Sequence, residues 1–219
     1  MNAMSAKSLG PGRPKDPEKR ASILQAAKQL FPENGFDGTS MDMIAALAGV
    51  SKLTVYSHFT DKESLFAEAV REKCMERMPL ELFNVAVSGP LREQLSAIAH
   101  AFFTLVTSPE SISLHRLLTS GIGSSVKLAQ IFWEAGPQTL QREFSTFLRR
   151  EVEAGQLEIP DIGRAASQFF CLLKGELHAR QLCGCCNAPF GKAEIDDHIA
   201  ATVDLFLRAY SASRRPLSP

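Results

Sequence analysis

The sequence contains no hydrophobic run long enough to cross a membrane, because a membrane-spanning helix needs about 18 consecutive apolar residues. The N-terminus, MNAMSAKSLGPGRPK, also lacks the apolar stretch of a secretory signal peptide. These two absences predict a cytoplasmic protein with no membrane partner. Without a secretory signal, the five cysteines are not expected to form a disulfide framework.

An excess of either charge is also missing, because 24 Lys and Arg residues balance 24 Asp and Glu residues. This balance argues against a protein that coats nucleic acid through overall positive charge. The clearest basic stretch is residues 1–15, which are rich in Gly, Pro and Ser and contain Arg13 and Lys15. We expect this stretch to be a flexible basic arm.

Sequence motifs of common enzyme sites are absent. There is no GxSxG nucleophile elbow, phosphate-binding P-loop, HExxH zinc motif or Rossmann glycine pattern. No Cys and His pair lies in a catalytic context either. We therefore expect a protein that is not an enzyme and that has no cofactor and no metal site.

Strand-like alternation of apolar and polar residues is missing, and apolar residues recur at helical spacing instead. The sequence predicts an all-α protein with a small domain over residues 16–75 and a larger helical domain over residues 76–219. In the larger domain, Gly and Pro residues separate the expected helices. These helices are expected near residues 91–105, 110–120, 124–154, 161–182 and 193–211.

Four helices are expected in residues 16–75. The first starts at Asp16-Pro17 and stops near PENGFDG, with distortion at Pro32. The second opens at Thr39-Ser40 and runs to about Leu47. Gly49 then allows a tight turn, Ser51 caps a short third helix, and Thr60 with Glu63 forms a capping-box pattern that opens the fourth. Two short helices joined by a glycine turn are typical of a helix-turn-helix unit.

The third helix, near residues 52–59, is too short to be stable by itself. Val55 and Phe59 lie four residues apart and can anchor it to the other helices. Its exposed side is then rich in polar side chains that suit DNA, whose major groove accepts one α-helix. Candidate contacts to bases or phosphates are Lys52, Thr54, Tyr56, the helix N-termini at Ser40 and Ser51, Lys62, and Arg13 and Lys15 on the arm.

Residues 31–66, FPENGFDGTSMDMIAALAGVSKLTVYSHFTDKESLF, resemble the N-terminal signature of the TetR family of bacterial transcriptional regulators, in its AcrR/AefR-like branch. The matching positions include Gly35-Phe36, Thr39-Ser40, Ala48-Gly49-Val50-Ser51, Thr54-Val55-Tyr56 and His58-Phe59. The resemblance implies that Lys52, Leu53, Tyr56, Ser57 and His58 face the major groove, and that Ser40, Thr54, Tyr56 and Lys62 contact phosphates. The sequence departs from the family at Leu53, where Gly is frequent, and at Pro32, where the first helix usually continues.

The same resemblance implies a homodimer formed by the last two long helices, 161–182 and 193–211. An apolar stripe from Ile162 to Leu177 and a second from Ile199 to Tyr210 are wide enough for a core and a partner, although they could also be wholly internal. The remaining helices would enclose a pocket for a small hydrophobic effector. Its expected lining is Phe102, Phe103, Leu117, Phe132, Trp133, Phe144 and Phe147, with His100, His115, Arg116, Glu134 and Gln141 as candidate polar contacts.

These features together predict a ligand-responsive regulator that binds a double-stranded DNA operator, expected to be a repressor that its effector releases from DNA. A different hypothesis concerns Cys183, Cys185 and Cys186, which could form a thiol sensor or a soft-metal site on the same scaffold. Their spacing is too compressed for ordinary zinc knuckles. A third alternative is a helical interaction module that does not bind DNA.

Overall fold

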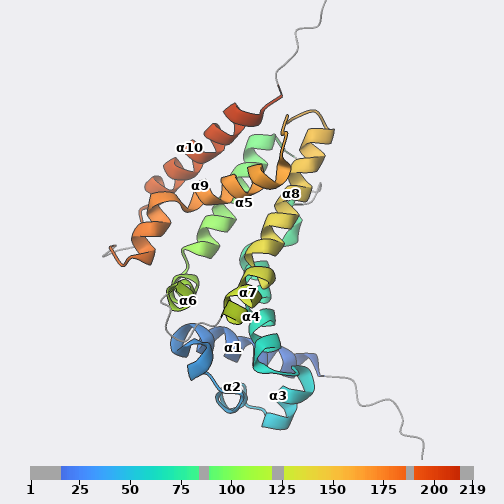
Figure 1. Ribbon diagram of the computed structural model, residues 1–219, viewed down its shortest axis with the longest axis vertical. Coiled ribbons are helices and arrows are strands. Elements are labelled where there is room, and N and C mark those ends of the chain that lie inside the picture. Colours follow the sequence, from blue (N-terminus) through green and yellow to red (C-terminus); the bar gives the residue numbers. More distant parts are fainter. Residues whose placement is uncertain (1–15, 84–88, 120–125, 186–189, 213–219) are drawn as a thin grey trace, which may run out of the picture.

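The computed structural model describes residues 16–83, 89–119, 126–185 and 190–212. Within these residues the chain forms ten α-helices and one 3₁₀ helix, and the sole strand-like feature is a bridge between Leu157 and Ser211. The expected all-α class is therefore confirmed. Helices α1, α2 and α3 form one end of the elongated molecule, and a bundle containing α5, α8, α9 and α10 forms the other (Figure 1). The predicted arm, with Arg13 and Lys15, lies outside the described residues.

The first three helices are α1 (Pro17–Gly38), α2 (Met41–Leu47) and α3 (Lys52–His58). Side-chain oxygens of Asp16, Ser40 and Ser51 accept hydrogen bonds from backbone N–H groups in the first turn of each helix. Such bonds satisfy donors that the helix itself leaves unpaired. The three helix starts predicted from these caps are confirmed.

Two glycines with positive φ shape these helices: Gly35 interrupts α1, and Gly49 lies just after α2. The φ angles are 74° at Gly35 and 67° at Gly49, a geometry that glycine adopts without steric strain. Helix α1 continues through Pro32 and is interrupted at Gly35, so the expected distortion lies three residues beyond the proline. The predicted turn at Gly49 is confirmed.

Helix α4 (Lys62–Arg77) begins differently from the prediction. The carboxylate of Asp61 accepts from the Ser64 N–H, and the Ser64 hydroxyl is near enough to bond the Asp61 N–H in return. The predicted capping box of Thr60 and Glu63 is therefore wrong by one residue. Aspartate and serine three residues apart supply the same pair of bonds, so the two patterns compete for the same turn.

The second half of the chain contains η1 (Leu80–Phe83), α5 (Leu91–Val106), α6 (Pro109–Thr119), α7 (Val126–Ala135), α8 (Pro137–Glu153), α9 (Ile162–Leu182) and α10 (Lys192–Tyr210). The single helix expected over residues 124–154 is wrong, because Gly136 has φ −116° and ψ −83° and separates α7 from α8. Pro137 lacks the N–H that a continuous helix would use and suits the first position of α8. Gly136 lies against α4: a Cβ added to it would be 3.1 Å from Val70 Cγ1 and 3.2 Å from Cys74 Sγ.

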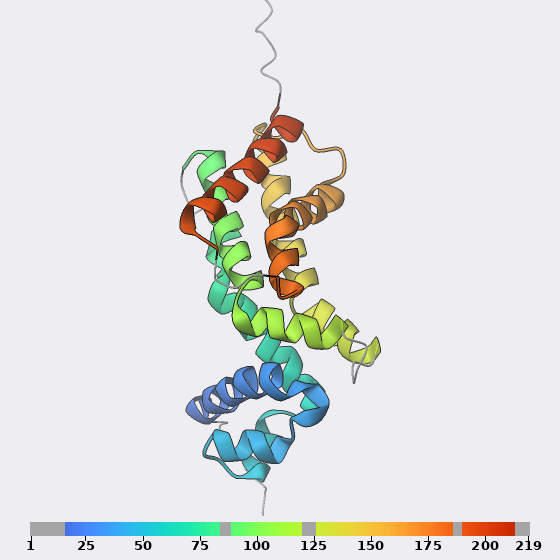
Figure 2. The ribbon, with the colours of Figure 1, turned by 90° about the vertical axis from the view of Figure 1, so that its left-hand side faces the viewer.

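The buried residues form two hydrophobic clusters, and α4 reaches both. Leu65, Phe66 and Val70 pack in the cluster of α1–α3, which also takes in Leu128 and Ala135 from α7. Cys74, further along α4, packs against both clusters. In Figure 2, α4 rises from the α1–α3 end toward the upper helices, and α6 crosses between the two ends. The division expected near residue 75 would fall inside α4, and it stays a prediction.

Helix α9 is kinked at Gly175, and α10 fills the kink. The His198 ring lies so close to Gly175 that an added Cβ would be 2.9 Å from its Cε1, and His198 Nε2 is 2.8 Å from the Leu173 carbonyl oxygen. The apolar stripe of α9 faces inward: Ala165, Phe169 and Leu173 are fully buried within the protomer. The stripe is therefore core, and the large apolar side chains that these two helices expose are Leu172 and Leu205.

Candidate nucleic-acid interface and ligand cavity

Helix α3 is held by its apolar side. Val55 is fully buried, Phe59 is 4% exposed, and Val50 packs against the same cluster. The Arg20 guanidinium lies 5.3 Å from the centre of the Phe59 ring and is bound to Glu68 at 2.7 Å, which connects α1, α3 and α4. A two-turn helix gains its stability from such packing. The opposite side of α3 is therefore presented to solvent in a fixed orientation.

That opposite side carries most of the residues predicted to contact DNA. Lys52, Leu53, Tyr56 and Ser57 are exposed, with exposed fractions of 80% for Leu53 and 45% for Tyr56. Thr54 and His58 are half-buried at its edges. The Thr54 hydroxyl lies 2.8 Å from that of Ser51, and the Ser57 hydroxyl donates to the Thr54 carbonyl. The surface thus presents one cation, several hydroxyls and one large apolar side chain.

Helix α2 starts at the predicted Ser40 and exposes two apolar residues, Met43 and Leu47, that the sequence interpretation missed. Ser40 is exposed, and its hydroxyl caps α2 by accepting from the Met43 N–H. Met43 and Leu47 are also exposed, which is unusual for large apolar side chains of a packed helix. Their spacing of four residues on a predicted short helix was the available signal. Apolar side chains of this kind can contact thymine methyl groups.

Lys52 is bound to an acidic neighbour on α2. Its ammonium lies 2.9 Å from the Asp42 carboxylate, and this hydrogen bond raises the pKa of Lys52 above its usual value. Both side chains are more than half exposed, so the pair can open when a competing anion approaches. Asp42 therefore orients Lys52 and also places a negative charge beside the surface that would meet DNA phosphates.

We expect Asp42→Asn to strengthen DNA binding, because it removes a charge that repels phosphates and it releases Lys52. The dissociation constant should fall roughly threefold to fivefold at low salt, with a steeper dependence on salt concentration. Fluorescence anisotropy with labelled DNA at several salt concentrations measures both. Weaker binding by the variant at unchanged thermal stability would mean that orienting Lys52 matters more than repulsion.

The Lys62 side chain is bound to backbone groups of the protein itself. Its ammonium donates to the carbonyl oxygens of Phe36 at 2.7 Å and Thr39 at 3.0 Å and lies 4.2 Å from the centre of the Phe36 ring. These contacts hold the connection between α1 and α2. This geometry gives Lys62 a positioning role in the protein itself, and a contact to the DNA backbone stays a prediction.

Lys62→Ala should therefore lower stability as well as DNA binding. Losing two hydrogen bonds from a charged donor is expected to reduce the free energy of unfolding by about 2 kcal/mol. Chemical denaturation monitored by circular dichroism measures the change. Lys127→Ala, on the exposed face of α7, is a matched control that should leave the unfolding free energy nearly unchanged. Equal stability of the two variants would restore the phosphate-contact interpretation of Lys62.

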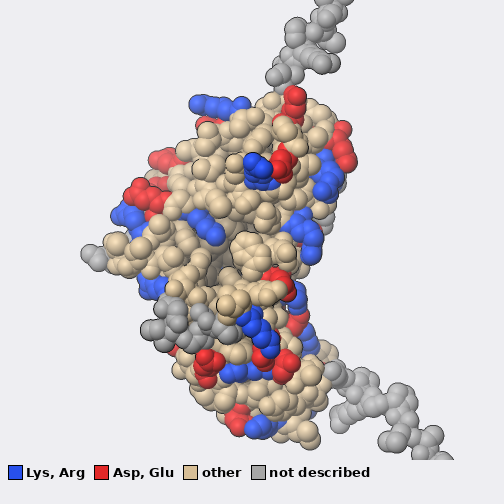
Figure 3. Space-filling model, viewed as in Figure 1, with Lys and Arg blue, Asp and Glu red and all other residues tan. Residues whose placement is uncertain are grey.

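A cavity of about 250 Å³ lies among helices α4–α9, and all six contribute side chains to its wall. Figure 3 shows a hollow on the face where α6, α7 and α9 meet in Figure 1, among interspersed charges of both signs. The cavity is lined by Val70, Lys73, Cys74, Phe102, Leu105, Val106, Ser111, Leu114, His115, Phe132, Trp133, Pro137, Leu140, Gln141, Ser167, Phe170, Cys171 and Lys174.

The structure divides the predicted effector residues into two groups. Phe102, Phe132 and Trp133 line the cavity, as do the polar candidates His115 and Gln141. The others do not line it: Phe103, Phe144 and Phe147 are buried in the hydrophobic core. Leu117 faces α1 instead, where a Cβ added to Gly35 would lie 3.7 Å from its Cδ2. The polar candidates His100, Arg116 and Glu134 do not line it either; Arg116 instead donates to the carbonyls of Gln181 and Leu182. Lys73 and Lys174 are the charged lining residues that the sequence interpretation missed.

Two histidines lie beside the cavity in a neutral pair. The rings of His115 on α6 and His178 on α9 are 5.5 Å apart, and His178 is only 5% exposed. Burial lowers the pKa of both rings, and the positive charge of Lys174 lowers it further. Together with the neighbouring His115, these effects bring the pKa of His178 to about 4.

Acidification should therefore destabilise the protein through His178. Between about pH 6.5 and pH 4 the unfolded chain binds a proton at this residue and the folded chain does not, so the free energy of unfolding falls by as much as about 1.4 kcal/mol per pH unit. Above pH 6.5 the residue has no such effect. His178→Gln should flatten the pH dependence of urea unfolding between pH 7.5 and pH 5. An unchanged pH dependence would mean that the pKa of His178 is the same in the folded and unfolded chains.

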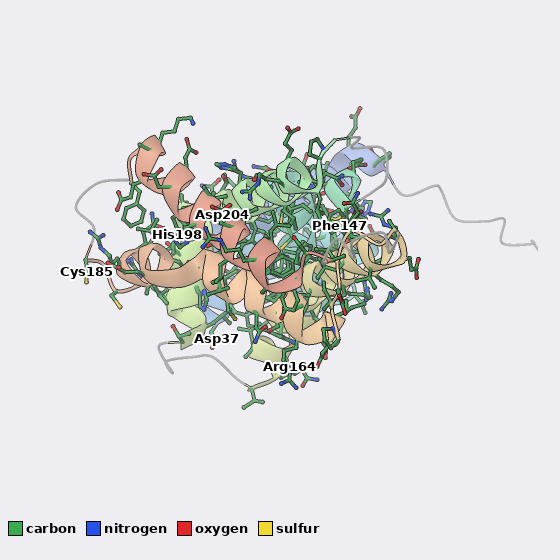
Figure 4. All side chains as sticks on the ribbon, turned by 90° about the horizontal axis from the view of Figure 1, so that it is seen from above. Asp37, Phe147, Arg164, Cys185, His198 and Asp204 are labelled. Carbon is green, nitrogen blue, oxygen red and sulfur yellow. The ribbon has the colours of Figure 1, made fainter. Side chains whose placement is uncertain are left out.

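The cysteine cluster is at the periphery of the molecule. Cys183 and Cys185 are exposed near the end of α9, and Figure 4 places Cys185 at the outer edge, far from Phe147 in the core. Cys186 lies outside the described residues. In the part of the chain that the structure describes, no three His, Cys, Asp or Glu side chains are grouped to hold a metal ion. No observation favours the thiol-sensor or soft-metal alternative. In the same described part, no helix is both long and apolar enough to span a bilayer.

Comparisons with known proteins agree with this arrangement. The family described as bacterial regulatory proteins, tetR family, matches residues 23–69, and the AefR-like transcriptional repressor C-terminal domain matches residues 93–212. The second match alone covers more than half of the chain. The HTH-type transcriptional regulator YdeS of Bacillus subtilis is 27% identical over 146 residues, which are 67% of this chain and 71% of YdeS.

Solved structures resemble the chain over most of its length. The flavonoid-responsive regulator FrrA has a TM-score of 0.69 and 32% identity, covering 91% of this chain and all of FrrA. A TetR family transcriptional regulator from Pseudomonas syringae has a TM-score of 0.66 and 33% identity, covering 90% of this chain and 98% of its own. With both halves matched by family and by structure, the chain belongs to the TetR family of bacterial transcriptional regulators.

Proposed function

We propose that the protein is a homodimeric repressor that binds operator DNA through α3 and is released when a small, largely apolar molecule occupies the cavity. The observation that carries this proposal is the α3 surface, which is fixed by buried Val55 and Phe59 and exposes Lys52, Leu53, Tyr56 and Ser57. A dimer supplies two such surfaces at a fixed separation, as operators with two half-sites require. Exposed Leu172 on α9 and Leu205 on α10 are apolar surface available for a partner.

Helix α4 supports coupling between the cavity and α3. Val70, Lys73 and Cys74 of α4 line the cavity, while Leu65 and Phe66 of the same helix pack with α1–α3. A ligand that prefers one position of α4 shifts the population of DNA-competent molecules. The coupling is reciprocal, so bound DNA must weaken ligand binding by the same factor.

The cavity's wall supports a small aromatic or aliphatic effector. Most of its lining is apolar, with a few polar groups, which is the usual composition of ligand pockets. FrrA, with 32% identity to this chain, is described as flavonoid-responsive. That description concerns FrrA, but it fits a cavity walled by Phe102, Phe132 and Trp133.

The test has two steps. Selection of genomic DNA fragments by the purified protein identifies the operator, and a gel-shift assay then measures its affinity and the mass of the complex. We expect two protomers or more per operator and a loss of binding when a ligand from a thermal-shift screen is added. Ligand that binds the cavity without changing operator affinity would refute the proposed response, and failure to select any sequence would refute specific DNA binding.

A further inference from the structure

The charged residues of the cavity are all basic. Lys73 and Lys174 line it together with His115, and no Asp or Glu is among the described residues that line it. The rest of the wall is mainly apolar and aromatic, including Phe102, Phe132 and Phe170. The cavity therefore combines an apolar wall with an excess of positive charge.

The two lysines differ in how their charge is balanced. Lys73 lies 3.4 Å from the Glu110 carboxylate, which partly neutralises it from outside the cavity. Lys174 is half-buried, and within the part of the chain that the structure describes it forms neither a hydrogen bond nor an ion pair. The nearby His115 and His178 rings offer no counter-charge. Lys174 is thus the cation of the cavity that lacks an internal partner.

A half-buried lysine beside an apolar wall gains from an anionic partner, because a charge is costly to desolvate without one. A carboxylate is such a partner and forms short, strong hydrogen bonds with an ammonium group. We propose that the effector is an amphipathic organic acid whose carboxylate pairs with Lys174 while its aromatic or aliphatic body lies against Phe102, Phe132 and Trp133. This inference rests on the proposed function, in which the cavity is the effector site.

The fluorescence of Trp133 can report ligand binding, because Trp133 is the one tryptophan of the sequence and it lines the cavity. The probes are 4-phenylbutyrate, 2-naphthoate and decanoate, each compared with its neutral primary amide in the full-length protein. Changes in Trp133 fluorescence give the dissociation constants. The variants are Lys174→Met, which removes the cation at similar length, and Lys192→Met, a matched change at an exposed lysine of α10 outside the cavity.

In the wild type and in Lys192→Met, we expect at least one acid to bind roughly tenfold or more tightly than its amide, as a charge-assisted hydrogen bond implies. Lys174→Met should abolish that preference while binding the amides as well as before. Thermal melting of Lys174→Met confirms that the variant is folded, and Lys174→Gln serves in its place if it is not.

Three outcomes overturn the proposal: acids and amides that bind equally, an acid preference that survives in Lys174→Met, or no binding of either series to the wild type. A gel-shift assay with each bound probe separates this proposal from the proposed function. Amides that bind as tightly as their acids and release DNA would refute the acid preference alone. Acids that bind through Lys174 without affecting operator affinity would refute the proposed response alone.

Discussion

The double variant Lys52→Ala, Tyr56→Phe is expected to lose roughly a hundredfold in operator affinity while its melting temperature stays that of the wild type. Both side chains are exposed on α3, and neither belongs to the buried cluster that holds this helix. Each contact to a base or phosphate contributes about 1–3 kcal/mol, so two lost contacts give an effect of this size. Gel-shift titration with the selected operator measures the loss.

Binding to non-specific DNA distinguishes a phosphate contact of Lys52 from a base contact, and a variant outside α3 serves as the control. If Lys52 contacts a phosphate, the double variant should also bind random DNA more weakly, with a salt slope smaller by about one. If Lys52 contacts a base, the loss should be confined to the operator. Lys192→Ala, on α10, should bind like the wild type. An unchanged operator affinity of the double variant would rule out α3 as the DNA-reading helix.

Phe144→Ala is expected to cost about 3–5 kcal/mol of unfolding free energy, the usual range for removing a buried phenylalanine. The Phe144 ring is fully buried, and its centroid lies 4.8–6.4 Å from those of five other phenylalanines. Since domains are typically stable by about 5–15 kcal/mol, this loss is a large part of the total. Urea unfolding followed by circular dichroism measures it.

A comparison of Phe144→Ala with Trp133→Ala tests which of these two residues contacts the effector. Trp133→Ala should weaken ligand binding with a stability loss below about 1 kcal/mol, because Trp133 lines the cavity and is 52% exposed. Phe144→Ala should show the reverse under conditions where it remains folded. Calorimetric titration with a ligand from a thermal-shift screen distinguishes the two. A loss of ligand affinity in Phe144→Ala at unchanged stability would restore Phe144 as a cavity residue.

The helix-turn-helix end was predictable because its signals are local. Ser40, Gly49 and Ser51 each act within a few residues of their own position, through a cap or a turn. The pair Val55 and Phe59 then fixes which side of α3 is buried. The error at the start of α4 was also local, because Thr60-Glu63 and Asp61-Ser64 are overlapping patterns of the same type.

The cavity was not predictable in the same way, because its wall depends on packing between distant segments. Phe102 and Phe103 are neighbours on α5, yet one lines the cavity and the other is buried and lies beside the His198 ring. Composition cannot distinguish Phe132, which lines the cavity, from Phe144, which does not. Lys174 became a candidate only when its surroundings showed an apolar wall and no acidic partner.

Because Gly136 has no side chain, α4 can pack closely against the corner between α7 and α8, and this contact helps to fix the relative position of the two ends of the molecule. A methyl group there would lie 3.1 Å from Val70 Cγ1 and 3.2 Å from Cys74 Sγ, so alanine would require α4 and the α7–α8 corner to move apart by a few tenths of an ångström. Gly136 is not part of the α3 surface and does not itself line the cavity, but it lies against Val70 and Cys74 of the cavity wall. Random mutagenesis for regulators locked in the bound or released state should therefore recover changes at residue 136, which would act by displacing α4 and not by contacting DNA or ligand itself.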